Sequence, residues 1–108
     1  MSTLVTEREV FAVSVVFTDD AMTVGLDDGR ALSVPLAWYP RLLKGTPIER
    51  EHFELIGDGE GIHWPQLDDD ISVEGLLAGR RSAESAASLS RWLEQREKSS
   101  NQTDQVTR

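Results

Sequence analysis

The chain has 108 residues, which is long enough for one compact domain and too short for two with independent cores. Its composition is 39% hydrophobic and 28% charged, which is typical of a globular protein. There is no cysteine, so disulfides, thiolate nucleophiles and cysteine-based zinc sites are excluded. The amino-terminal stretch has no apolar run that could serve as a signal peptide or a membrane span, so we expect a cytoplasmic protein.

The formal net charge of -8 is divided unevenly along the chain. Residues 1–79 hold 5 Lys or Arg against 15 Asp or Glu, a balance of -10, whereas residues 80–108 hold 6 against 4, a balance of +2. A surface this acidic repels phosphate backbones, which argues against nucleic-acid binding by the main domain. The same charge would attract a basic protein partner. The alternative interpretation is that the acidic residues only keep the protein soluble.

Three short strands are predicted in the first third of the chain. In residues 11–17 the apolar side chains alternate, which predicts a strand with one buried face formed by Phe11, Val13, Val15 and Phe17. A second strand follows with Met22, Val24 and Leu26 on one face, and a third with Leu32, Val34 and Leu36. The pair Asp28-Gly29 between the second and third strands predicts a tight hairpin, so the three strands form an antiparallel meander.

Short helices and further strands are predicted next. Pro40 suits the first turn of a helix that ends at Gly45, and the stretch from Thr46 to Glu49 has the spacing of a capping box. Two further strands are expected at residues 53–56 and 62–64. A helix over residues 71–78 would then begin after an Asp70 cap and end at Gly79.

The last segment is predicted to be an amphipathic helix that begins near Ser82. Its apolar stripe has helical spacing and consists of Ala86, Leu89, Trp92 and Leu93. Such a stripe packs on its own domain, on a second copy or on another protein, and we expect a homodimer through this helix. Residues 99–108 are polar and are predicted to be disordered. The fold class is therefore α+β, with a small domain over residues 1–79 and a carboxy-terminal helix and tail over residues 80–108.

The residues with the most chemical potential lie in one short stretch. His63 is close in sequence to Asp68, Asp69 and Asp70, and a histidine with carboxylates could bind a divalent metal or act as an oriented base. The spacing matches no established metal motif, however, and the acids lie where a helix amino terminus favours negative charge. We therefore interpret them as helix-capping residues. The role of His63 stays open, with His63, Asp68 and Asp70 as the metal alternative.

Other enzymatic arrangements have little support in the sequence. No serine lies in a nucleophile-elbow pattern, and the glycine-rich stretch of residues 57–61 carries two acids and is not followed by the lysine of a P-loop. The basic tail, with Arg80, Arg81, Arg91 and Arg96, could contact phosphate, so regulatory nucleic-acid contact is a minor alternative. No catalytic residue and no cofactor are predicted.

Several consecutive motifs resemble one bacterial family. They are the Asp28-Gly29 hairpin, the stretch from Trp38 to Leu42, the stretch from Glu49 to Leu55, and above all residues 61–65 (Gly-Ile-His-Trp-Pro) followed by residues 67–73 (Leu-Asp-Asp-Asp-Ile-Ser-Val). Together they resemble the domain of unknown function 2442 over residues 10–79. The resemblance implies a small α+β domain without an established activity.

The resemblance also bears on partners. Some members of that family occur beside a second small protein in an arrangement suggestive of a toxin and its antitoxin, and some carry an appended helix-turn-helix. This chain has only one helix and a polar tail after Gly79, which is too little for a DNA-reading module. We therefore predict a non-enzymatic protein-interaction domain, in the antitoxin-like or regulatory half of a two-protein module. The alternative is a metal-binding or enzymatic domain.

Overall fold

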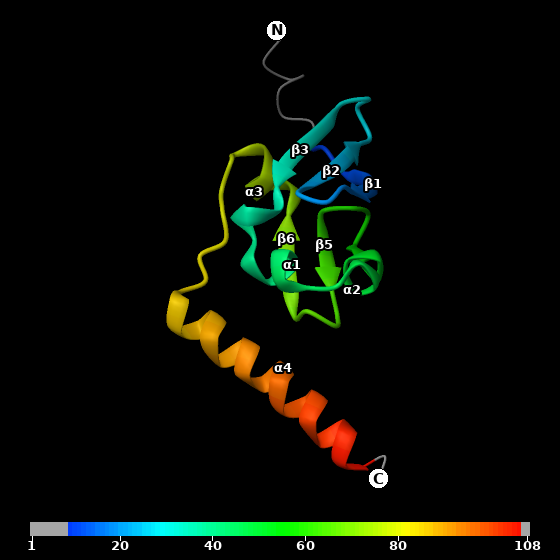
Figure 1. The fold of residues 1–108 in the computed structure, drawn as a ribbon. Helices are drawn as coiled ribbons and strands as arrows, with labels where there is room; N and C mark the ends of the chain where they lie inside the picture. Colours follow the sequence, from blue (N-terminus) through cyan, green and yellow to red (C-terminus); the bar gives the residue numbers. More distant parts are fainter. Residues whose placement is uncertain (1–8, 107–108) are drawn as a thin grey trace, which may run out of the picture.

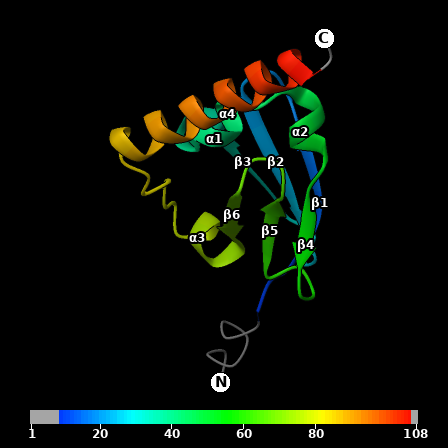
Figure 2. The same ribbon diagram turned by 90° about the horizontal axis from the view of Figure 1, so that it is seen from below.

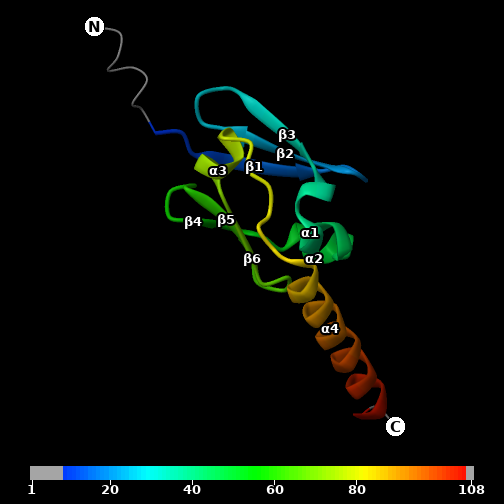
Figure 3. The same cartoon turned by 90° about the vertical axis from the view of Figure 1, so that its left-hand side faces the viewer.

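The computed structural model describes residues 9–106, with side chains from Glu9 to Lys98, and contains two antiparallel sheets, several short helices and one long helix (Figure 1). The first sheet has the order β1-β2-β3, with strands Ala12–Phe17, Ala21–Leu26 and Ala31–Pro35. The second has the order β4-β5-β6, with strands Glu54–Ile56, Gly61–Trp64 and Asp69–Ser72. Figure 3 shows the first sheet above the second. The α+β prediction and the initial meander are confirmed.

Strand β1 departs from the predicted alternation. The register against β2 shifts between Ala12 and Ser14, which marks a β-bulge. Because the bulge inserts one extra residue, the side chains before it point to the opposite face of the sheet from the one that the alternation predicts. Ala12 is therefore buried, while Val13 is 59% exposed. The prediction that Val13 belongs to the core is therefore wrong, whereas Val15 is buried as expected.

The short helices follow the sequence signals closely. A 3-10 turn, η2 (Leu36–Trp38), leads into α1 (Pro40–Lys44), and α2 (Pro47–Glu51) comes next. The predicted capping box of α2 is present: Thr46 Oγ1 accepts from the Glu49 N–H at 3.1 Å, and the Glu49 carboxylate accepts from the Thr46 N–H at 2.8 Å. These two bonds use backbone donors that would otherwise be free at the helix start.

The acidic run Asp68–Asp70 does not cap a helix, contrary to the prediction. Asp68 has a positive φ of 52°, and the turn that it closes sends the chain back along β5 as a sixth strand, β6. Helix α3 (Val73–Leu77) begins only after this strand, and its cap is Ser72, whose hydroxyl accepts from the Gly75 N–H at 2.9 Å. The predicted end at Gly79 is confirmed by its φ of +75°.

The long helix α4 (Ala86–Val106) begins later and ends later than predicted. Ser82 does not cap it; the Ser85 hydroxyl accepts from the Ser88 N–H at 3.1 Å, one turn further on. The helix continues through residues 99–106, which were predicted to be disordered, and residues 107–108 lie outside the described part of the chain. Figure 2 shows α4 running across α1 towards α2, and Figure 1 shows it extending away from the two sheets.

The core takes residues from both sheets and is mostly aliphatic, with Tyr39, Trp64 and Trp92 as its buried aromatic side chains. Trp64 of β5 is fully buried, and its ring meets that of Phe17 edge-on with 6.4 Å between centroids. The indole Nε1–H donates to the Arg50 carbonyl at 3.0 Å, so its polar atom is satisfied. None of the described helices is long and apolar enough to cross a membrane.

Candidate functional site

A polar cleft of about 560 Å³ lies between β6 and the segment that joins α3 to α4. One wall is formed by consecutive residues from Asp68 to Ser72, and the other by the linker from Arg80 to Glu84. Tyr39, Arg41, Gly75 and Ser88 complete its lining. Its volume falls within the range of ordinary ligand sites. The cleft therefore brings the acidic stretch beside the most basic dipeptide of the chain.

Hydrogen bonds and stacking hold the linker wall in place. The Tyr39 hydroxyl donates to the Arg80 carbonyl at 2.9 Å, and the Ser82 N–H donates to the Trp38 carbonyl at 3.0 Å. The guanidinium of Arg81 lies 4.6 Å from the centre of the Trp38 ring, a cation–π contact. Because η2 and its flanking residue supply these contacts, the linker is tied to the domain along its length.

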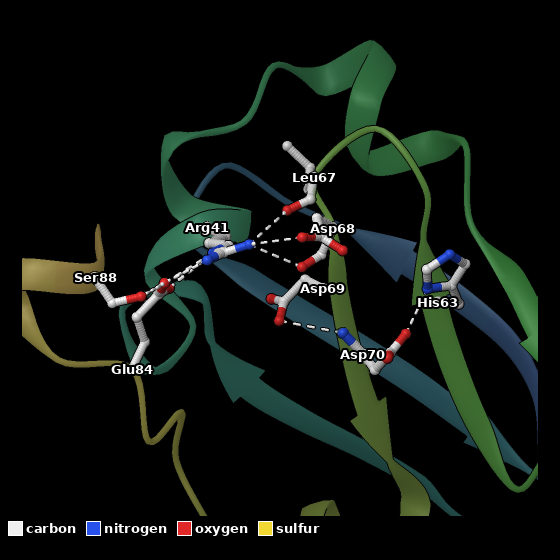
Figure 4. Close-up of polar contacts among 8 residues, drawn as sticks. All are labelled: Arg41, His63, Leu67, Asp68, Asp69, Asp70, Glu84 and Ser88. Carbon is white, nitrogen blue, oxygen red and sulfur yellow. Dashed lines mark hydrogen bonds and ion pairs between the residues drawn. The ribbon is translucent and has the colours of Figure 1, made fainter. Parts of the chain in front are cut away.

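Arg41 of α1 is the hub of the site (Figure 4). Its Nε and Nη2 donate to the Glu84 carboxylate at 2.9 and 2.6 Å, a two-point contact that holds the guanidinium plane. Its Nη1 donates to the Asp68 carbonyl at 2.9 Å. The hydrogen bond from Arg41 lowers the pKa of Glu84, which also accepts from the Ser88 hydroxyl at 2.8 Å. One arginine thus joins α1, the β5–β6 turn and the linker that precedes α4.

Asp69 behaves differently from its two neighbours. Its side chain is half-buried, and its Oδ1 accepts from the Asp70 N–H at 3.1 Å. Burial raises the pKa of Asp69 to about 6, while the positive charge of Arg41 acts in the opposite direction. The carboxyl group therefore lines the cleft at a position where its negative charge is poorly solvated.

The three residues considered for metal binding, His63, Asp68 and Asp70, do not form one cluster, because only His63 and Asp70 are in contact. His63 and Asp70 lie opposite each other in the β5–β6 ladder, and the His63 ring Nδ1 is hydrogen-bonded to the Asp70 carboxylate, which raises the pKa of His63. Asp68 instead faces Arg41, at 3.6 Å from its Nη1. Across residues 9–98, no group of three or more His, Cys, Asp or Glu side chains is placed to hold a metal ion. His63, whose role the sequence left open, is thus paired with Asp70 at an exposed position.

The predicted interaction stripe on α4 is divided between solvent and the protein's own domain. Trp92 is 8% exposed, Leu89 and Leu93 are half-buried, and Ala86 is exposed. The guanidinium groups of Arg41 and Arg96 lie over the Trp92 ring at 5.1 and 4.7 Å. Arg96 in turn donates to Glu49 at 2.9 Å. The most apolar part of the stripe therefore packs on its own domain, and the homodimer stays a prediction.

Sequence reasoning overlooked the residues that organise the cleft. Arg41 and Glu84 are separated by 43 positions, and Tyr39 and Arg80 by 41, so no local pattern connects them. Asp69 was grouped with its neighbours as a capping acid. A detectable signal was available in residues 69–72, where Ile71 alternates with polar residues as in a half-buried strand.

The family described as "Protein of unknown function (DUF2442)" matches residues 12–82, about two thirds of the chain. The chain belongs to this family. Two solved structures resemble the chain. A protein of unknown function from Rhodospirillum rubrum is 26% identical, with a TM-score of 0.63, and the match covers 71% of this chain and 95% of that one. An uncharacterized protein from Chromobacterium violaceum is 25% identical, with a TM-score of 0.61, covering 83% and 82%. No functionally curated protein matches the chain.

Proposed function

We propose that this DUF2442 protein is a non-enzymatic interaction domain that binds a basic segment of a partner protein in the cleft between β6 and the linker. The single observation that carries this proposal is the position of Asp69, a half-buried carboxyl group on the wall of that cleft. A ligand cation placed there would stabilise the ionised form that burial disfavours. Binding a cation thus offsets the free-energy cost of ionising the half-buried Asp69 carboxyl group in the unliganded protein.

The surrounding charges support a cationic ligand. Asp68 and Asp70 flank Asp69 and are both exposed, so they add negative potential at the same end of the cleft. Of the three arginines in the lining, Arg41 is already engaged by Glu84, and Arg81 lies against Trp38. The balance of -10 over residues 1–79 extends this attraction over the domain and favours rapid encounter with a basic partner.

A titration with synthetic peptides tests the proposal. The full chain would be titrated with an oligolysine peptide and, as a matched control, an oligoglutamate peptide of the same length. We expect oligolysine to bind with an affinity that falls as salt rises, because exposed charges are screened. Asp69→Asn should weaken binding by about tenfold, the size of one charge-assisted hydrogen bond.

The control variant is Asp58→Asn, which removes the same charge from an exposed position in the β4–β5 turn. It should change the affinity much less than Asp69→Asn does. If oligoglutamate bound as tightly as oligolysine, or if oligolysine failed to bind, the proposal would be overturned. A thermal melt with Mg²⁺, Mn²⁺ or Zn²⁺ covers the metal alternative, since a metal bound only by the folded state raises the midpoint.

The finer role in a two-protein module rests on the family resemblance alone. In that role the partner would be a toxic protein that this chain neutralises. Expressing the product of the adjacent gene with and without this chain tests it directly, because growth should be arrested without the chain and restored with it. If the neighbour arrests no growth, the antitoxin-like role is rejected while peptide binding is unaffected.

A further inference from the structure

Strand β6 forms one wall of the cleft and is an edge strand, because it pairs with β5 and with no other described strand. The Val73 N–H donates to the Glu60 carbonyl at 2.9 Å, so the backbone groups of Val73 point towards β5. Along an antiparallel strand, alternate residues direct their backbone groups to the same side. Those of Ile71 and Asp69 therefore also point to β5, and those of Asp70 and Ser72 point to the open edge.

Two of these edge groups are already in use. The Asp70 N–H donates to the Asp69 carboxylate, and the Ser72 carbonyl stands at the helix cap, where it accepts the first bond of α3. The Asp70 carbonyl and the Ser72 N–H are left, and neither is bonded to a described side chain of residues 9–98 or to a described backbone group outside the strand ladder. Both residues are exposed. A donor and an acceptor on either side of Ile71 thus face the cleft.

This pair of groups fits a parallel added strand. In parallel pairing, one residue of the new strand donates to the residue before its counterpart and accepts from the residue after it. With Ile71 as the counterpart, the new residue donates to the Asp70 carbonyl and accepts from the Ser72 N–H. Antiparallel addition requires both groups of a single residue, and neither Asp70 nor Ser72 has both available.

The position of Asp69 adds a requirement on the ligand sequence. Its carboxylate accepts from an N–H that points to the open edge, so the carboxylate itself lies at that edge. Asp69 and Ile71 are two residues apart and share a face of β6. In a parallel strand, the residue two positions before the one opposite Ile71 therefore has its side chain beside Asp69.

We propose that the cleft binds an extended protein segment that adds to β6 as a parallel strand, bonded to Asp70 and Ser72, with a Lys or Arg two positions earlier beside Asp69. This inference rests on the proposed function and specifies the sequence of its ligand. The ligand has a Lys or Arg, then one residue of any type, and then the residue that bonds to Asp70 and Ser72. Strand addition supplies affinity through main-chain bonds, and the basic side chain supplies selectivity. The linker from Arg80 to Glu84, tied to Trp38, Tyr39 and Arg41, forms the opposite wall.

The test uses three capped synthetic peptides with the full chain. The probe contains Lys-Thr-Val, the second has Glu in place of Lys, and the third has N-methylvaline in place of Val. We expect the probe to shift the Ser72 amide resonance and to slow its hydrogen exchange. The N-methyl peptide should bind about fivefold or more weakly, because it lacks the N–H that donates to Asp70. The Glu peptide should bind at least tenfold more weakly.

Protein variants complete the design. Asp69→Asn keeps an acceptor for the Asp70 N–H and removes the charge, so it should reduce the preference for Lys over Glu, whereas Asp58→Asn should leave the preference unchanged. If the Lys peptide binds but the Ser72 amide is unaffected and N-methylation has no effect, strand addition is refuted and binding of a basic partner stands. Failure of the Lys peptide to bind also refutes strand addition, and the oligolysine titration then decides the proposed function. Tighter binding of the Glu peptide would refute both.

Discussion

Two tryptophans of this protein are buried in opposite ways. Trp64 lies fully inside the core with aliphatic neighbours and the Phe17 ring, and its only polar atom is bonded to a backbone carbonyl. Trp92 is nearly as buried, but two guanidinium groups lie over its ring, and each is paired with a glutamate from another element. The core is therefore held by apolar burial, which depends little on pH or salt, whereas α4 is docked by burial of Trp92 together with charged contacts.

The largest expected effect is that of Trp64→Ala. Removing the side chain leaves a cavity between the sheets and leaves the Arg50 carbonyl without its indole donor, so the free energy of unfolding should fall by about 3–5 kcal/mol. Denaturant unfolding followed by circular dichroism measures it. A loss no greater than that of Trp92→Ala would contradict the contrast between the two sites.

Trp92→Ala should have a smaller and more local effect. Burial of the indole and its two cation–π contacts stabilise the docked helix by about 2 kcal/mol. Their loss should release α4 and speed amide exchange from Ala86 onwards, while the amides of β2 and β5 keep their protection. Hydrogen exchange read by mass spectrometry measures both. Equal loss of protection in the sheets would show that α4 and the core unfold as one unit.

The acid pH dependence should separate the cleft from the α4 contacts. Burial raises the pKa of Asp69 from 3.8 to about 6. Between these pH values the folded chain binds a proton that the unfolded chain does not, so the free energy of unfolding should rise as pH falls from 6 to 3.8. The effect is on the order of 1–2 kcal/mol once solvent screening is discounted. Denaturant unfolding between these pH values should show it in the wild type and in Asp58→Asn, but not in Asp69→Asn.

Glu84 should act in the opposite direction. Its hydrogen bond from Arg41 lowers its pKa below the ordinary 4.5, so its contribution is present above that pH and is lost as pH falls through the folded value. Glu84→Gln should destabilise the docked helix by about 1 kcal/mol near neutral pH, and high salt should reduce the difference. Exchange rates in α4 at two salt concentrations measure this. A salt-independent difference would indicate that packing, and not charge, is lost.

The smallest effect belongs to the exposed pair of His63 and Asp70. Because the Asp70 hydrogen bond is the main cause of the raised His63 pKa, Asp70→Asn should return that pKa towards its ordinary value. The melting midpoint should stay unchanged, since exposed pairs contribute little. Histidine proton resonances recorded across a pH titration provide the measurement. An unchanged pKa would show that Glu54 and the other neighbouring charges dominate.

Local signals in the sequence were sufficient where the structure depends on adjacent residues. The Thr46–Glu49 capping box, the left-handed glycines at positions 29 and 79, and the strand faces of Met22, Val24 and Leu26 all form as predicted. In each case the energetic preference lies within a few residues, in a hydroxyl that reaches a backbone N–H or a glycine that tolerates positive φ. The family and the α+β class followed from such motifs.

Tertiary structure alone decided the rest. The bulge that exposes Val13 depends on the register against β2, and the pairing of Asp69–Ser72 with β5 overrides the low strand preference of aspartate. The cleft exists because Arg41 and Tyr39 reach residues more than 40 positions away, which periodicity cannot reveal. By itself, the sequence determined the initial three-stranded meander, the capped helix α2 and the acidic character of the domain. Only the folded chain decided that Asp69 lies half-buried at an open strand edge, because burial and edge exposure are properties of packed elements.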